Sequence, residues 1–141
     1  MVWITKLIGC VGFALLGFAG SATAAEYTYT LKQKFTIGGE GGWDYLTFDA
    51  PSNRLFVTRG TRVQVVDPDN GVVLAEIADT PGVHGVALAT DLGKGYTSNG
   101  RDNSVSVFDL KTLKTLTKVM TPDGENPDFI AYDQLSTRSG F

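Results

Sequence analysis

The sequence is poor in the two side chains on which many metal and catalytic sites depend. Its 141 residues include one cysteine and one histidine. One cysteine cannot form an internal disulfide, and one histidine excludes every site that needs two imidazoles, including the histidine-rich zinc and non-haem iron classes. Basic runs are also absent, because the 12 Lys and Arg residues are outnumbered by 15 Asp and Glu residues and none directly follows another. We therefore expect no nucleic-acid partner.

Long uncharged runs are absent too, with one exception near the start. Residues 7–25 follow Lys6 without a charge and end in small residues, Ala-Thr-Ala-Ala. This order is typical of a secretory signal peptide, which we predict over residues 1–24. One alternative is an uncleaved membrane anchor, which is disfavoured because glycines dilute the apolar run. The other is a lipoprotein signal at Cys10, which is disfavoured because the apolar core follows the cysteine instead of preceding it. We expect a periplasmic or secreted protein that meets a membrane only through this segment, before cleavage.

The rest of the sequence has an ordinary globular composition and repeats itself. VQVVD at residues 63–67 matches VSVFD at residues 105–109, an offset of 42. FD at residues 48–49 recurs as YD at residues 132–133, at twice that offset. A period of about 40–45 residues with four short strands in each unit is typical of a β-propeller blade.

Short runs rich in β-branched and aromatic residues, separated by clusters of Gly, Pro, Asn and Asp, predict four strands in each unit. No stretch after residue 26 keeps a helical period, so we predict an all-β fold. The apolar character of residues 63–66 and 83–88 indicates strands covered on both faces. The predicted strands are residues 45–48, 54–58, 62–66 and 72–77 in the first unit and 83–89, 94–98, 104–108 and 113–119 in the second.

Several of these strands resemble a known repeat family. LFVTR at residues 55–59 and GYTSN at residues 95–99 resemble the Y-V-T-N strand of the YVTN-type β-propeller repeat, and VSVFD at residues 105–109 resembles the strand that follows it. The pattern covers residues 42–133 and resembles the N-terminal part of an exported YncE-like protein. The resemblance implies a propeller of about seven four-stranded antiparallel blades. It implies no single activity, because such propellers serve as binding platforms, surface proteins and occasionally catalytic domains.

The chain is short for this architecture. Closed propellers have about four to eight blades, whereas this sequence accounts for about two and a half. An incomplete ring leaves apolar blade faces uncovered, so we expect self-association or a need for missing blades. The alternative to an incomplete propeller is a small β-sandwich that folds independently. The predicted parts are a signal peptide (1–24), a leading strand at 27–37 with a glycine-rich linker (25–41 together), blade 1 (42–82), blade 2 (83–126) and the start of a truncated blade 3 (127–141).

Two motifs that resemble ligand loops are interpreted as connections. DPDNG at residues 67–71 lacks the spacing and distal glutamate of an EF-hand but suits a tight turn, in which Asp67, like Asp109 in the next unit, accepts backbone N–H groups. GGEGG at residues 38–42 lacks the Gly-Lys-Ser/Thr ending of a phosphate loop and no helix follows it, so it is interpreted as a flexible connection. We expect no metal site and no cofactor.

The candidate ligand site is one rim of the propeller channel. In propellers the start of each inner strand and the connection between the second and third strands face one rim. His84 aligns with Trp43 and Pro127 at those starts, and we expect it to lack metal or catalytic partners unless missing blades supply them. The rim groups could bind a small polar ligand, or they could cap strands and pair across blades. The predicted rim residues are Trp43, Asp44, Arg59, His84, Asn99, Arg101, Asp102 and Asp128.

Three functions stay open. The sequence favours an exported β-propeller binding or scaffold protein without chemistry of its own, whose partner is an unknown small molecule or protein. The first alternative is a fragment of a propeller enzyme, lactonase-like or dehydrogenase-associated, for which the sequence offers neither a Cys-x-x-Cys-His haem site nor an evident cluster of carboxylates with histidine. The second is a non-functional product of a truncated or frameshifted gene.

Overall fold

The structure is a computed structural model that describes residues 28–121 and 125–135. The chain divides into two compact units, Met1–Lys32 and Gln33–Phe141, and each is considered by itself. Of the first unit, residues 28–32 are described, and they form neither helix nor strand. The predicted signal peptide lies outside the described residues. Within the described residues, no helix is long and apolar enough to cross a membrane.

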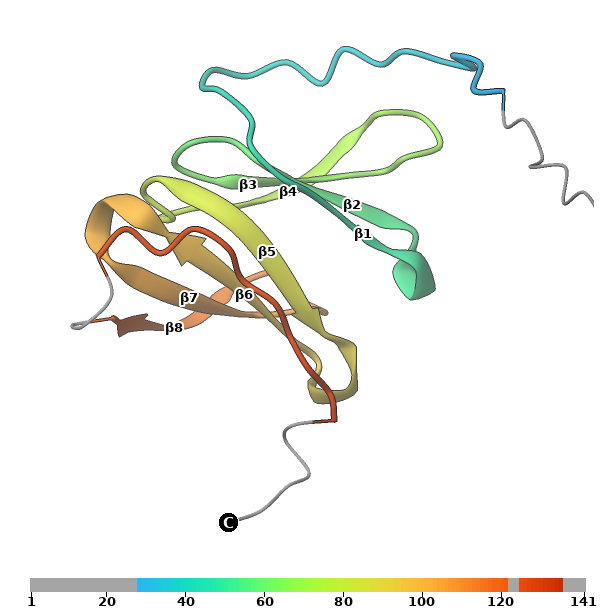
Figure 1. Ribbon diagram of the computed structural model, residues 1–141. Helices are drawn as coiled ribbons and strands as arrows, with labels where there is room; N and C mark the ends of the chain where they lie inside the picture. Colours follow the sequence, from blue (N-terminus) through green and yellow to red (C-terminus); the bar gives the residue numbers. More distant parts are fainter. Residues whose placement is uncertain (1–27, 122–124, 136–141) are drawn as a thin grey trace, which may run out of the picture. The chain divides into compact units, whose positions relative to one another are not determined.

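The second unit contains two four-stranded antiparallel sheets, which we call blade 1 and blade 2 (Figure 1). In both blades each strand pairs with the next one along the chain. No α-helix occurs among the described residues, so the predicted all-β fold is confirmed. The strands are β1 Leu46–Asp49, β2 Arg54–Thr58, β3 Val63–Val66 and β4 Val73–Ile77 in blade 1, and β5 Val83–Ala89, β6 Lys94–Asn99, β7 Ser104–Asp109 and β8 Thr115–Met120 in blade 2.

The eight predicted strands of the two repeats are all present, with ends displaced by at most two residues. The strand β3 is buried at every position, Gln64 included, as its near-continuous apolar sequence predicts for a strand covered on both faces. The strand β7 instead alternates, with Ser104, Ser106 and Phe108 buried and the residues between them partly exposed. The two repeats therefore share a topology but bury their strands differently.

Aspartates close the turn between the third and fourth strand of each blade. The carboxylate of Asp67 accepts the backbone N–H of Asp69 at 2.9 Å, and Gly71 ends the turn with a φ of 75°. In blade 2 the carboxylate of Asp109 accepts the backbone N–H of Thr112 at 2.7 Å. Hydrogen bonding from Thr112 is the largest of the effects that lower the pKa of Asp109. The interpretation of these motifs as turns, made from their residue types, is confirmed.

The hydrophobic core spans both blades. The ring of Phe56 on β2 packs against that of Phe108 on β7, with centroids 5.9 Å apart. Arg54 also crosses between the blades, because its Nη1 donates to the carbonyl of Leu110 at 2.8 Å while its Nη2 pairs with Asp49 at 3.1 Å. The buried cluster consists of Phe56, Val63, Val65, Ile77, Val83, Val86, Phe108 and Leu110.

The segments that flank the two blades form no strand among the described residues. Residues 28–37, where a leading strand is predicted, form no strand in the part of the chain that the structure describes. A strand requires a neighbour that pairs with its backbone, and none of the described strands does so. Residues 125–135 also form no strand, although the segment lies beside β5 (Figure 1). Side chains hold this segment in place; for example, the Tyr132 hydroxyl donates to a carboxylate oxygen of Asp91 at 2.9 Å.

Candidate functional site

The connection between the two blades is held by backbone hydrogen bonds on both of its sides. The N–H of Gly82 donates to the carbonyl of Gly60 in blade 1 at 2.7 Å. The carbonyl of Gly82 accepts the N–H of Gly100 in blade 2 at 2.9 Å. His84 follows this connection by two residues, at the start of the inner strand β5. We call this end of the blades the rim, and its rigid backbone suits a preorganised site.

Three side chains from three successive repeats converge at the rim. The Nδ1–H of His84 donates to Oδ2 of Asp44 at 2.6 Å, and Nδ1 lies 3.8 Å from Oδ1 of Asp128. The imidazole is 29% exposed, and the carboxylates of Asp44 and Asp128 are 44% and 69% exposed. Within the part of the chain that the structure describes, His84 is the one basic side chain within 4.0 Å of either carboxylate, and the contacts are ionic when the imidazole is protonated. Two negative charges therefore share one imidazole.

The repeat explains this convergence. Asp44 and Asp128 are 84 positions apart, which is two repeats, so they occupy equivalent places in the first and third repeats of the sequence. Gly85 holds the corresponding place in blade 2, where a Cβ would lie 2.9 Å from Cγ2 of Ile130. The expectation that the chain lacks a cluster of carboxylates with histidine is thus wrong. The signal that could have revealed it is the recurrence of aspartate at twice the period.

A pocket of about 410 Å³ adjoins the cluster. Trp43, Asp44, His84 and Arg101 line it, so an aromatic, an acidic, an imidazole and a basic residue border the same space. Gly82 allows this arrangement, because a Cβ there would lie 2.6 Å from Cγ of Arg101. A pocket with an aromatic wall and a few convergent polar groups is the usual form of a small-molecule site.

Arg59 lies beside this pocket and holds the glycine-rich connection. Its Nη2 donates to the carbonyl of Gly39 at 2.6 Å. Arg62 holds the same connection, because its Nη2 donates to the carbonyl of Glu40 at 3.1 Å. Arg59 and Arg101 both line an adjoining pocket of about 300 Å³. The predicted rim residue Arg59 is therefore near the site, where part of its guanidinium is used to position the backbone.

Two predicted rim residues have structural roles instead. Asn99 is fully buried, and its amide donates to the hydroxyls of Ser104 and Ser106 at 3.0 and 2.8 Å. The prediction that Asn99 faces a ligand is thereby corrected. Asp102 pairs with Lys118 at 2.8 Å. Burial alone would raise the pKa of Asp102, but the hydrogen bonds from Lys118 and Ser104 outweigh it and hold that pKa below its ordinary value.

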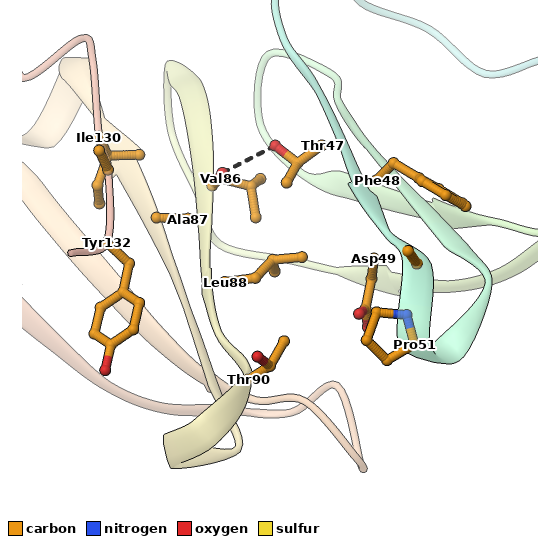
Figure 2. Close-up of a pocket in the computed structure, with 12 residues that line it drawn as sticks. Thr47, Phe48, Asp49, Pro51, Val86, Ala87, Leu88, Thr90, Ile130 and Tyr132 are labelled. Carbon is orange, nitrogen blue, oxygen red and sulfur yellow. Dashed lines mark hydrogen bonds between the residues drawn. The ribbon is translucent and has the colours of Figure 1, made fainter. Parts of the chain in front are cut away.

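A second pocket, of about 450 Å³, lies along the inner strands (Figure 2). The hydroxyl of Thr47 donates to the carbonyl of Val86 at 2.9 Å and so links the inner strands of the two blades. Apolar side chains such as Phe48 and Leu88 line much of this pocket, and the carboxylate of Asp49 is already paired with an arginine. Polar groups free to orient a ligand are concentrated at the rim, which is therefore the better candidate site.

Two four-stranded antiparallel blades, each built in chain order and packed through a shared core, define the chain as part of the β-propeller class. Similarity to solved structures agrees with this. The match to hydrazine synthase of Kuenenia stuttgartiensis covers 75% of this chain and 30% of the hydrazine synthase chain, with a TM-score of 0.62 and 20% sequence identity. The match to apo AztD from Citrobacter koseri covers 64% of this chain and 26% of the AztD chain, with a TM-score of 0.54 and 14% sequence identity. At these identities the similarity shows the fold alone.

Sequence comparison identifies more particular relatives. The chain is 31% identical over 106 residues to the Salmonella typhimurium protein named "Uncharacterized protein YncE", a match that covers 74% of this chain and 30% of that protein. The protein of the same name from Salmonella typhi matches to the same extent. No family model matches the chain. The predicted resemblance to YncE-like propeller proteins is confirmed, and the chain spans about a third of the length of these relatives.

Proposed function

We propose that the chain is an exported β-propeller binding protein that takes a small polar ligand at the rim and carries no chemistry of its own. The observation that carries this proposal is the pocket beside His84, where Trp43, Asp44 and Arg101 present an aromatic face and both signs of charge. An indole buries apolar ligand surface, a guanidinium pairs with a carboxylate, and an aspartate pairs with an ammonium group. Small zwitterions, such as free amino acids, and small carboxylic acids match this combination.

A hydrolytic alternative is suggested by the His84–Asp44 pair, which resembles the histidine and aspartate of a catalytic triad. A triad also needs a nucleophile within hydrogen-bond distance of the imidazole. Ser98 lies close to the site, but its hydroxyl donates to the carbonyl of Asp128 and accepts the N–H of Gly85. Its engagement with the backbone favours binding over catalysis.

Export is the second part of the proposal. It is supported by the basic, apolar and small-residue order of residues 1–24. Expression of the full chain in a Gram-negative bacterium, followed by mass spectrometry of the periplasmic fraction, tests it. We expect a protein that begins at Ala25 or one residue later. Recovery of the uncleaved chain from the cytoplasm or the membrane would contradict export.

Tryptophan fluorescence tests ligand binding. The chain has two tryptophans, Trp3 in the predicted signal peptide and Trp43 at the rim, so after cleavage the emission reports on the rim alone. Titration with a panel of amino acids and small carboxylic acids is expected to give a saturable change for at least one compound. Arg101→Met should weaken that binding at least about tenfold, whereas Lys94→Met, a change to a cation remote from the rim, should leave it unaltered. A panel without any saturable change would contradict the proposal.

A further inference from the structure

We propose that Asp44, His84 and Asp128 together bind one divalent transition-metal ion, with Zn²⁺ as the best match. The inference deepens the proposed function, on which it rests, because the ion would occupy the rim site and help to hold its ligand. The three residues come from three successive repeats and are brought together by the repeat itself. Their ligand atoms all lie within 4.8 Å of one another.

The distances suit a shared metal ion after small movements. Ligand atoms about 2.1 Å from a tetrahedral zinc ion are about 3.4 Å from one another. Nδ1 of His84 lies 2.6 Å from Oδ2 of Asp44 and 3.8 Å from Oδ1 of Asp128, one value below that separation and one above it. Shifts of less than about 1 Å in these exposed side chains would place both oxygens and the nitrogen around one centre.

The charges also favour a cation. Two carboxylates lie within ion-pairing distance of one imidazole, which carries at most a single positive charge, and the nearby cation Arg101 lines the adjoining pocket without an ion pair to either carboxylate among the described residues. Metal binding at Nδ1 needs the neutral imidazole with its proton on Nε2, so an imidazolium releases its Nδ1 proton to solvent, whereas a neutral ring exchanges the Nδ1 proton for one on Nε2 without net release. The resulting site pairs a doubly positive ion with two carboxylates and so neutralises the cluster.

The donor set selects the kind of ion. One imidazole nitrogen with two carboxylate oxygens suits Zn²⁺ and related transition metals. Mg²⁺ and Ca²⁺ prefer oxygen ligands throughout, which disfavours them here. Three protein ligands leave at least one coordination position for water or for a ligand in the adjoining pocket. The site is thus suited to contribute a Lewis-acidic contact to a bound carboxylate.

Nuclear magnetic resonance gives a direct test, because His84 is the only histidine in the sequence. The purified protein is prepared without a polyhistidine tag and titrated with ZnCl₂ in a buffer free of chelators. We expect the ring signals of His84 to shift and saturate at one equivalent of Zn²⁺, and an equal concentration of Mg²⁺ to leave them unchanged. Ring signals that do not respond to excess Zn²⁺, or that respond equally to Mg²⁺, would overturn the inference.

Calorimetry with variants assigns the ligands. Asp44→Asn and Asp128→Asn each remove one ligand charge at an exposed position and should weaken Zn²⁺ binding at least about tenfold. Asp69→Asn makes the same chemical change at an exposed turn outside the rim and should bind Zn²⁺ as the unmodified protein does. Wild-type affinity in both cluster variants would show that the ion binds elsewhere and would also overturn the inference.

The test separates this inference from the proposed function. Zinc binding at His84 without any organic ligand from the fluorescence panel would retain the metal site and reject the small-molecule function. Binding of an organic ligand that depends on Arg101, with no response of His84 to Zn²⁺, would retain the function and reject the metal site.

Discussion

The ring of Phe108 on β7 lies over Gly95, its directly paired residue on β6. A Cβ built on Gly95 would lie 2.1 Å from Cζ of the ring, well inside van der Waals contact. Phe108 is fully buried and packs across to blade 1, so the ring has no room to move away. The glycine in the second repeat is therefore a packing requirement of the core between the blades.

Gly95→Ala is expected to destabilise the protein by about 1–3 kcal/mol, because the added methyl group forces a buried aromatic ring from its position. Urea unfolding followed by circular dichroism measures the change. The matched control is Gly42→Ala, where no atom lies within 4 Å of the new methyl group. Equal stability of the two variants would mean that the ring of Phe108 does not pack on Gly95.

The Arg54–Asp49 pair should matter more for stability than an exposed ion pair. Arg54→Met leaves the carboxylate of Asp49, which is 4% exposed, without its cationic partner and removes the bond to the Leu110 carbonyl. We expect a loss of about 3 kcal/mol or more in the free energy of unfolding. Arg62→Met, which breaks the more exposed pair with Glu76, should cost about 1 kcal/mol or less. Similar losses in the two variants, measured by urea unfolding, would contradict this.

The Asp102–Lys118 pair should make stability depend on pH at acidic values. The pKa of Asp102 is held below its ordinary value of 3.8, since the bonds from Lys118 and Ser104 outweigh burial. Its contribution to stability is therefore present above that value and is lost as the pH falls through the folded-state pKa. The hydrogen bond with Asp102 raises the pKa of Lys118 above 10.5, so the contribution of Lys118 is lost only at strongly alkaline pH.

Lys118→Met tests this linkage. The difference in the free energy of unfolding between wild type and variant should be constant from about pH 5 to pH 9 and should shrink below about pH 4. Glu76 and Asp109 also have lowered pKa values, but they titrate in both proteins and cancel in the comparison. A difference that stays the same down to about pH 2 would show that the pair does not stabilise the fold.

Blade 1 exposes an apolar surface that should drive association. Leu46 and Phe48, which share one face of β1, are both more than half exposed. We expect sedimentation coefficients that rise with protein concentration and a reduced rise in the double variant Leu46→Ser, Phe48→Ser. Leu92→Ser changes a similarly exposed leucine outside this face and should leave association unaltered. A protein that sediments as a monomer at all concentrations would refute the prediction.

The sequence predicts the strands of the two repeats well, because local residue types control them. Alternating β-branched residues define strands such as β7, and Asp67 and Asp109 mark the turns through bonds within a few residues. The segment at residues 28–37 shows the limit of this reasoning. Its alternating pattern expresses a preference for extended backbone, whereas a strand also needs a partner, and none of the described strands supplies one.

The candidate site was predicted in part. The repeat puts Asp44 and Asp128 at equivalent positions, next to the position that His84 occupies in the second repeat. Their mutual contact depends on how successive repeats pack together, which local patterns do not report. Asn99 was misplaced for a related reason, since its amide faces Ser104 and Ser106 on the neighbouring strand. Serines at alternate positions opposite an asparagine would have indicated a buried polar network.

The backbone bonds at Gly82 also decide how the two blades could move. They tie blade 1 to blade 2 at the rim, through Gly60 on one side and Gly100 on the other. Further along the inner strands, the link between Thr47 and Val86 is made by a side chain. Away from the rim the blades are joined by side chains, including those of Arg54 and the Phe56–Phe108 core, so we expect any relative motion of the blades to be smallest at the rim. Such a motion would widen the pocket of Figure 2 and hardly change the distances around His84.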